Sequence, residues 1–218
     1  MEAFLDVVRR AAAEVLADRP GRVLEIGPGT GQWLLELAGR RRVESIVTVD
    51  VVPPHLIPEA EALAPRKAVA DGRRLPFQGR TFDTVVCVNV ASILPYGGLR
   101  RILREMGRVL RPGGRGVVTV QNRAHPVLYA RMDRQPRRYR SAEIPFSYRG
   151  SDILRWIRDA GGRKAVIHPQ SFGVPRYGKG KICGAFQVLM TGAHHQLINR
   201  HRPLSPVLMF SWDACNSI

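Results

Sequence analysis

The chain has 218 residues, 44% of them hydrophobic, and a formal net charge of +16. This length and apolar content suit a single domain, 1–218, with a full core, whereas two domains would be crowded. No run of about 18 apolar residues occurs, so no membrane span is expected.

The first twenty residues are predicted to form an amphipathic helix. Apolar side chains recur there at helical spacing: Phe4, Val8, Ala11, Ala12, Val15 and Leu16. They do not form the continuous apolar core of a secretory signal peptide. The cysteines, Cys87, Cys183 and Cys215, include no CxxC pair. A reducing cytoplasm is therefore the expected location.

From residue 22 onward, short apolar runs alternate with amphipathic stretches, which is typical of a parallel sheet with helices on both faces. The expected strands are 22–26, 45–50, 67–70, 83–89, 115–120 and about 164–168. The expected helices are about 31–40, 54–64, 97–110 and 151–160. The sequence therefore predicts an α/β, Rossmann-like, mostly parallel sheet.

Two segments depart from this alternation. Residues 121–150 are polar, basic and aromatic, and a long irregular segment at this point predicts a lid or substrate loop. In the tail, 182–198 could form one helix and 204–212 is apolar but ambiguous. We expect residues 171–218 to cover the substrate.

The sequence V-L-E-I-G-P-G-T-G, from Val23 to Gly31, stands where the first strand meets the next helix. Glycines there allow a tight turn and let a ligand approach the backbone. The helix that follows would direct its amide groups at that ligand. The spacing is G-x-G-x-G, and Gln32 stands where the dinucleotide fingerprint has its last glycine, which argues against NAD.

Two acids follow at strand ends. Asp50 ends the second strand about twenty residues after the glycines, where a carboxylate can accept both hydroxyls of a ribose. Asp71 ends the third strand, next to Gly72, and could lie beside an adenine amino group. Each acid alone could be a capping residue, but the succession of strand ends favours a nucleoside ligand.

The ordered motifs resemble those of class I S-adenosylmethionine-dependent methyltransferases. They are the glycine turn followed by V-T-V-D, A-D-G-R-R-L-P-F, F-D-T-V-V-C-V-N-V and R-V-L-R-P-G-G-R-G-V-V-T-V. The resemblance covers about residues 20–122 and, more loosely, 150–170. It implies the fold and the cofactor, S-adenosyl-L-methionine, but not the acceptor.

The resemblance also implies roles for individual residues. Around the methionine part of the cofactor it places Glu25, Gly27, Gly29 and Gly31. At the adenosine it places Asp50 on the ribose, Val51 against the adenine, and Asp71 with Gly72 at the adenine edge. Asn89 and Val90 would face the methionine part and the reaction site.

The sequence departs from the family in three places. Asn89 stands where many relatives have an acid, and Ser92-Ile93 stands where Glu-His is frequent. The family also closes its sheet with an antiparallel seventh strand. Here the chain ends at Ile218, so we expect that strand to be short or truncated.

Methyl transfer requires alignment of a nucleophile with the sulfonium methyl, and a general base helps for some acceptors. His125, just after the fifth strand, and Tyr96 are the catalytic candidates, with His168, His194 and His195 as weaker ones. No cluster has metal-ligand spacing, so no metal is expected.

The leading hypothesis is methyl transfer to oxygen, carbon or nitrogen of a small acceptor, such as a secondary metabolite, a quinone or a lipid-like compound. The alternatives are an RNA methyltransferase and a non-catalytic cofactor-binding subunit that activates a partner. The net charge and the arginines of 131–140 favour RNA, although arginine-rich codon usage would also explain them. The oligomeric state stays open, a homodimer included.

Overall fold

The computed structural model describes residues 21–37, 43–94, 96–123, 147–170 and 207–215. The predicted N-terminal helix, most of the 121–150 insertion and the 182–198 segment lie outside these ranges, as do His125, His194 and His195.

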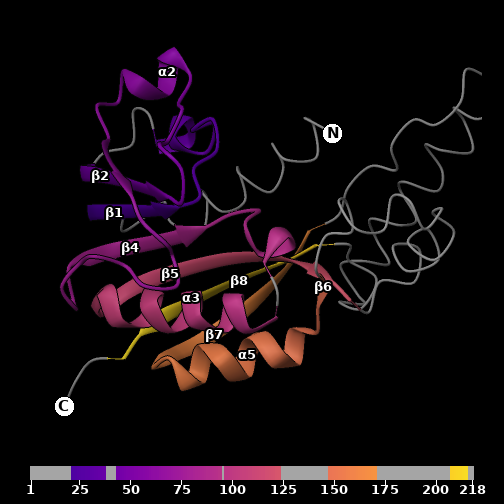
Figure 1. Ribbon diagram of the computed structural model, residues 1–218. Coiled ribbons are helices and arrows are strands. Elements are labelled where there is room, and N and C mark those ends of the chain that lie inside the picture. The colour runs from indigo at the N-terminus through magenta and orange to yellow at the C-terminus, as the bar shows by residue number, and fades with distance from the viewer. Residues whose placement is uncertain (1–20, 38–42, 95, 124–146, 171–206, 216–218) are drawn as a thin grey trace, which may run out of the picture.

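One sheet in the order β3-β2-β1-β4-β5-β8-β7 forms the centre of the described structure, with β6 paired to β5 (Figure 1). The strands are β1 (Gly21–Ile26), β2 (Val43–Asp50), β3 (Arg66–Val69), β4 (Phe82–Cys87), β5 (Leu110–Asn122), β6 (Ser147–Tyr148), β7 (Gly162–Gln170) and β8 (Val207–Ala214). The pairs β1–β2, β1–β4, β2–β3, β4–β5 and β5–β6 are parallel, and β8 is antiparallel to β5 and β7. The predicted mostly parallel, Rossmann-like α/β fold is confirmed.

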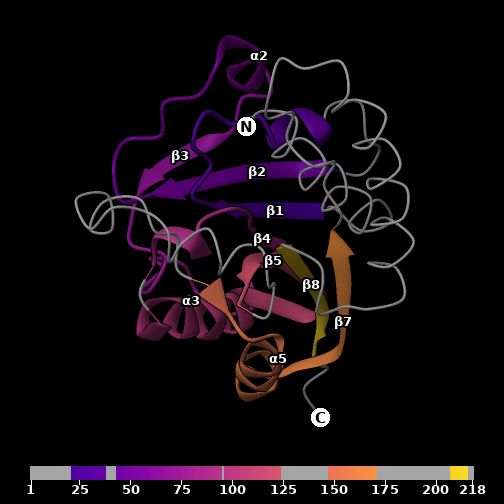
Figure 2. The same ribbon diagram turned by 90° about the vertical axis from the view of Figure 1, so that its right-hand side faces the viewer.

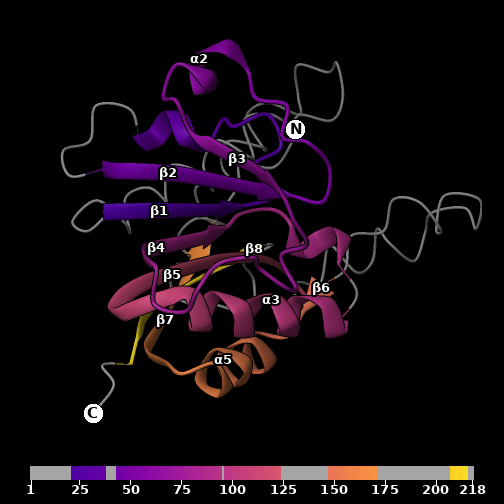
Figure 3. The same ribbon diagram turned by 60° about the vertical axis from the view of Figure 1, so that its left-hand side comes forward.

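Helices cover both faces of this sheet. The helices α3 (Tyr96–Val109) and α5 (Gly150–Asp159) lie side by side on one face (Figure 3). Their apolar side chains, such as Leu103 and Trp156, pack against Phe210 and Trp212 of β8. On the opposite face, a second cluster contains residues of two short helices, η1 (Leu34–Leu37) and α2 (Pro58–Glu61).

Of the helix predicted at 31–40, the structure describes residues 31–37, and these contain only the 3₁₀ helix η1. Gly27, Gly29 and Gly31 all have positive φ, of 71°, 57° and 80°, and a right-handed helix cannot pass through such residues. The amides that follow bond three residues back, Leu34 N to Gly31 O and Glu36 N to Trp33 O, which is the 3₁₀ pattern. The predicted row of α-helical amides facing a ligand is therefore absent from residues 31–37.

The strand β8 corrects the expectation of a short or truncated seventh strand. It spans eight residues and pairs along its length with β5 and β7 (Figure 2). Leu208, Phe210 and Trp212 pack with α3 and α5, whereas Met209 belongs to the opposite cluster. A strand buried on both faces has a continuous apolar sequence, which is why 204–212 was ambiguous. Residues 207–214 of the expected substrate cover thus lie within the sheet.

The loop after β3, which carries Asp71, is held on α3 by two charged side chains. Glu105 Oε2 accepts the amide of Leu75 at 2.8 Å, and Arg108 donates to the carbonyls of Phe77 at 2.8 Å and Leu75 at 3.0 Å. Arg108 also bonds Glu105 at 2.7 Å. That hydrogen bond is the main reason that the pKa of the Glu105 carboxyl lies below its ordinary value. Burial acts in the opposite direction and raises the pKa, but by less.

We expect Glu105→Ala to lower the free energy of unfolding by about 1–3 kcal/mol, because the Leu75 amide and Arg108 lose their acceptor. A depressed folded-state pKa means that ionised Glu105 stabilises the fold above its unfolded pKa and that this contribution fades as the pH falls through the folded pKa. Urea unfolding should therefore show a larger difference from wild type at neutral pH than at about pH 3. Equal unfolding free energies at neutral pH would contradict this role.

Candidate functional site

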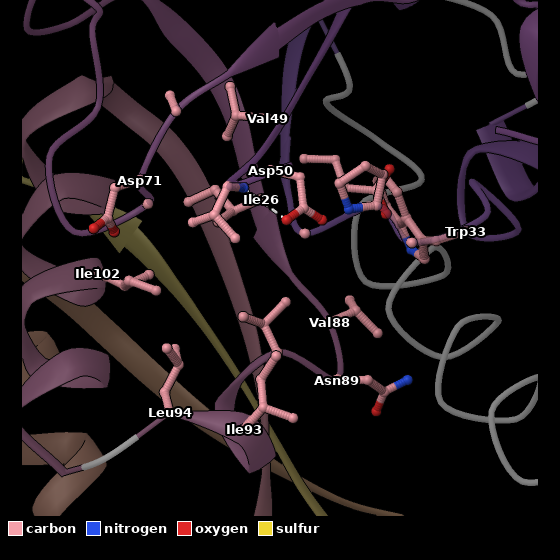
Figure 4. Close-up of a pocket in the computed structure, with 18 of the residues that line it drawn as sticks. Ile26, Trp33, Val49, Asp50, Asp71, Val88, Asn89, Ile93, Leu94 and Ile102 are labelled. Atoms are coloured by element: carbon pink, nitrogen blue, oxygen red, sulfur yellow. Dashed lines mark hydrogen bonds between the residues drawn. The ribbon is translucent and has the colours of Figure 1, made fainter. Parts of the chain in front are cut away.

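A cavity of about 320 Å³ opens where β1, β2, β3 and β4 end (Figure 4). The carboxyl ends of parallel strands are where ligands bind in open α/β sheets. Its lining includes every residue assigned to the cofactor by resemblance except Gly31. These residues are Glu25, Gly27, Gly29, Asp50, Val51, Asp71, Gly72, Asn89 and Val90.

The three glycines of the turn differ in their surroundings. A Cβ on Gly27 would lie 2.3 Å from Val90 Cγ2, and a Cβ on Gly29 would meet nothing within 4 Å. Gly31 lies outside the cavity lining, and its Cβ would lie 2.8 Å from Ala60 Cβ. Gly31 therefore serves the turn and its packing on α2, whereas Gly27 and Gly29 border the cavity.

Three carboxylates border the cavity at successive strand ends. Glu25 is only 2% exposed. Asp50 Oδ1 accepts the amide of Val51 at 2.7 Å. In Figure 4, Asp50 lies between Asp71 at one end of the cavity and Trp33 at the other. The cavity thus offers carboxylate oxygens as hydrogen-bond acceptors along most of its length.

Asp71 is bound by Arg73, whose side chain donates to both carboxylate oxygens at 2.6–2.9 Å. The hydrogen bond from Arg73 is the main reason that the pKa of the Asp71 carboxyl is lowered, so this group is ionised at neutral pH. A carboxylate has about four lone-pair sites. The backbone and side chain of Arg73 together make four contacts with it, the amide bond at 2.8 Å included, so Arg73 engages both oxygens and fixes the orientation of the carboxylate.

Asn89 borders the cavity in a left-handed backbone conformation, with φ of 62°. Asn tolerates this left-handed conformation better than most side chains. Its amide donates to Thr119 Oγ1 at 2.8 Å, and its carbonyl accepts Ser92 Oγ at 3.3 Å. This turn ends β4 at Cys87, two residues earlier than the sequence predicted.

The sequence analysis missed an apolar part of the lining. It includes Ile26, Trp33, Val49, Val88, Ile93, Leu94 and Ile102. Ile102, buried on α3, reaches the cavity from a helix that the sequence predicted without indicating this contact. Ile93 is 75% exposed, although it belongs to this lining.

Among the described residues, the cavity lining contains none of the proposed bases. His125 lies outside the described residues, and Tyr96 is the first residue of α3, with only its backbone described. Nε2 of His168, on β7, lies 2.8 Å from Oγ of Ser211, and His168 is not part of the cavity lining. Burial, and secondarily Arg115, lowers the pKa of His168.

Comparison with known proteins decides the family. The methyltransferase domain family matches residues 23–114. A demethylmenaquinone methyltransferase of Mycobacterium sp. (strain KMS) is 32% identical over 169 residues, which are 70% of this chain and 69% of that protein. The chain belongs to the class I S-adenosylmethionine-dependent methyltransferases.

Two further methyltransferases match this chain over a shorter range. A demethylmenaquinone methyltransferase of Deinococcus radiodurans is 39% identical over 50% of this chain and 47% of its own length. A phosphatidylethanolamine N-methyltransferase of Cereibacter sphaeroides is 40% identical over 50% of this chain and 55% of its own length. The chain thus spans about half the length of these two curated relatives.

The fold is shared more widely than the sequence. A protein solved in complex with the Haloferax volcanii Trm112 methyltransferase activator superimposes with a TM-score of 0.68 at 18% identity, covering 99% of this chain and 93% of that one. Within the described residues, no helix has the length and apolar composition needed to cross a membrane.

Proposed function

We propose that the cavity binds S-adenosylmethionine and that the chain transfers its methyl group to a small-molecule acceptor. The observation that carries this proposal is the series of carboxylates at or just beside the ends of β1, β2 and β3, next to a glycine turn. When bound, the cofactor supplies a methyl group already activated by the positive charge on sulfur. The contribution of the protein is then to hold and align the reactants.

The residues present fit such a cofactor. Asp50 would accept the ribose hydroxyls, and Asp71 with Gly72 would border the adenine edge, beside Val51 and the apolar Leu94 and Ile102. The turn at Gly27 and Gly29 leaves room for the methionine part. Glu25, buried next to this turn, would face its ammonium group. Asn89 and Val90 would border the transferred methyl.

We propose that the acceptor is a quinone or a lipid-like compound rather than a secondary metabolite. Two relatives are named for demethylmenaquinone and one for phosphatidylethanolamine. Ile93, exposed on the rim of the cavity, offers the apolar contact that such an acceptor would use. His125 and Tyr96 stay the proposed catalytic residues for acceptors that must lose a proton.

We also propose that residues 1–218 act as one domain in the cytoplasm, with 121–150 and the tail before β8 forming the acceptor side. The support is that β1 to β8 share one sheet and that no CxxC pair occurs. A basic chain with net charge +16 leaves RNA as the competing acceptor.

The test is incubation of the purified chain with isotopically labelled S-adenosylmethionine and, separately, demethylated quinones, phosphatidylethanolamine vesicles or mixed RNA. Mass spectrometry should find the label on a quinone or lipid, and Asp50→Asn should abolish most of this transfer. Label on RNA would overturn the acceptor assignment. Cofactor binding without any release of S-adenosylhomocysteine would instead support the non-catalytic subunit.

A further inference from the structure

The backbone segment after β4 forms one wall of the cavity although it has little regular structure. Between Val90 and Leu94 it contains only a 3₁₀ turn, η2 (Ala91–Ile93). The turn is closed by two local backbone bonds, Ile93 N to Val90 O at 3.1 Å and Leu94 N to Ala91 O at 3.2 Å. Ile93 and Leu94 nevertheless border the cavity, so something outside the segment must fix its position.

A single side chain from a distant part of the sequence bonds this segment twice. Tyr148 Oη lies 3.1 Å from the carbonyl oxygen of Ala91 and is also hydrogen-bonded to the carbonyl oxygen of Leu94. The phenol has one proton to donate, which is shared between these two acceptors. Both ends of the η2 turn are therefore held from one point.

The side chain of Tyr148 is itself held in place by packing and by backbone hydrogen bonds. Tyr148 is fully buried, and its ring packs edge-to-face on Trp156 of α5, with the centroids 6.2 Å apart. Its backbone pairs with Asn122 in β6–β5, and its carbonyl accepts the amide of Arg123 at 3.0 Å. The hydroxyl is thus fixed by the sheet on one side and by α5 on the other.

We propose that Tyr148 is a positioning residue for the cofactor: its hydroxyl holds the Val90–Leu94 wall in the arrangement that binds adenosine. This inference rests on the proposed function. If the wall adopts the competent arrangement in only a fraction of molecules, the apparent dissociation constant rises by the inverse of that fraction. Loss of one such hydrogen bond would reduce the fraction to about one tenth, equivalent to about 1.4 kcal/mol.

The experiment uses Tyr148→Phe, which keeps the buried ring and removes only the hydroxyl. We expect calorimetry to show about tenfold weaker binding of S-adenosylhomocysteine. Binding of 5′-methylthioadenosine, which lacks the amino-acid part, should weaken by a similar factor because Leu94, at one end of the wall, would border the adenine. Hydrogen exchange of the Ile93 and Leu94 amides should be faster in this variant, with no change in β1.

Phe82→Leu is the matched control. Phe82 is 2% exposed in the same core cluster and belongs to another edge-to-face pair, with Phe77, at the beginning of β4 and away from the cavity. It should lower stability while leaving both affinities unchanged. Equal affinities in Tyr148→Phe and wild type would overturn the inference. Failure of the wild type to bind either ligand would instead overturn the proposed function.

Discussion

Substitution of Gly27 by alanine is expected to abolish cofactor binding and to cause the largest loss of stability among the glycines of the turn. The added Cβ would lie 2.3 Å from Val90 Cγ2, far inside the contact distance of two carbons. Gly27 also has φ of 71°, where a side chain costs roughly 1–2 kcal/mol. Relief of the clash requires movement of Val90, and with it the wall of the cavity.

Gly161→Ala separates the backbone strain from this clash. Gly161 has φ of 82° between α5 and β7, and its Cβ would meet nothing within 4 Å. We expect this control to lose only the strain energy and to bind S-adenosylhomocysteine like wild type. Denaturant unfolding and calorimetry on both variants make the measurement. Retained binding in Gly27→Ala would show that the turn does not need to be free of side chains there.

Asp50→Asn is expected to weaken binding of S-adenosylhomocysteine at least about tenfold, or about 1.4 kcal/mol, with little change in stability. The carboxylate can accept from two ribose hydroxyls, whereas an amide offers one acceptor oxygen. The side chain stays similar in size, and its oxygen can still accept the amide of Val51. The loss should therefore concern the ligand more than the fold.

Asp159→Asn is the control for the change of charge. Asp159 lies at the end of α5, with Arg100 at 3.4 Å across an exposed pair, and it is not part of the cavity lining. Such a surface pair contributes little to stability. The dissociation constant should equal that of wild type. An unchanged constant in Asp50→Asn as well would refute the ribose assignment.

The sequence was most informative where one local pattern determines the structure. The amphipathic pattern of 97–110 predicted α3 to within one residue at each end, and the apolar run of 83–89 predicted β4, which the structure places at Phe82–Cys87. The glycine turn follows β1 and Asp50 ends β2, as predicted, whereas β3 ends at Val69, two residues before Asp71. These features depend on residues close together in the chain.

Features that depend on contacts between distant segments were missed or misjudged. Strand β8 lacked an alternating pattern because both of its faces are buried. The positive φ of Gly31 excludes an α-helical start at residue 31, and the described residues 34–37 form the 3₁₀ helix η1, which a helical periodicity cannot reveal. Tyr148 lies in the segment 121–150, which the sequence predicted only as an irregular lid or substrate loop. Its contact with Ala91 joins residues 57 positions apart, and no sequence pattern encodes it.

The most direct test of the account is a calorimetric titration of the folded wild-type chain with S-adenosylhomocysteine. The account predicts saturable binding at one site, lost in Gly27→Ala and retained in Gly161→Ala. Absence of any uptake of this compound or of S-adenosylmethionine, by protein that unfolds cooperatively, would contradict the assignment of the cavity.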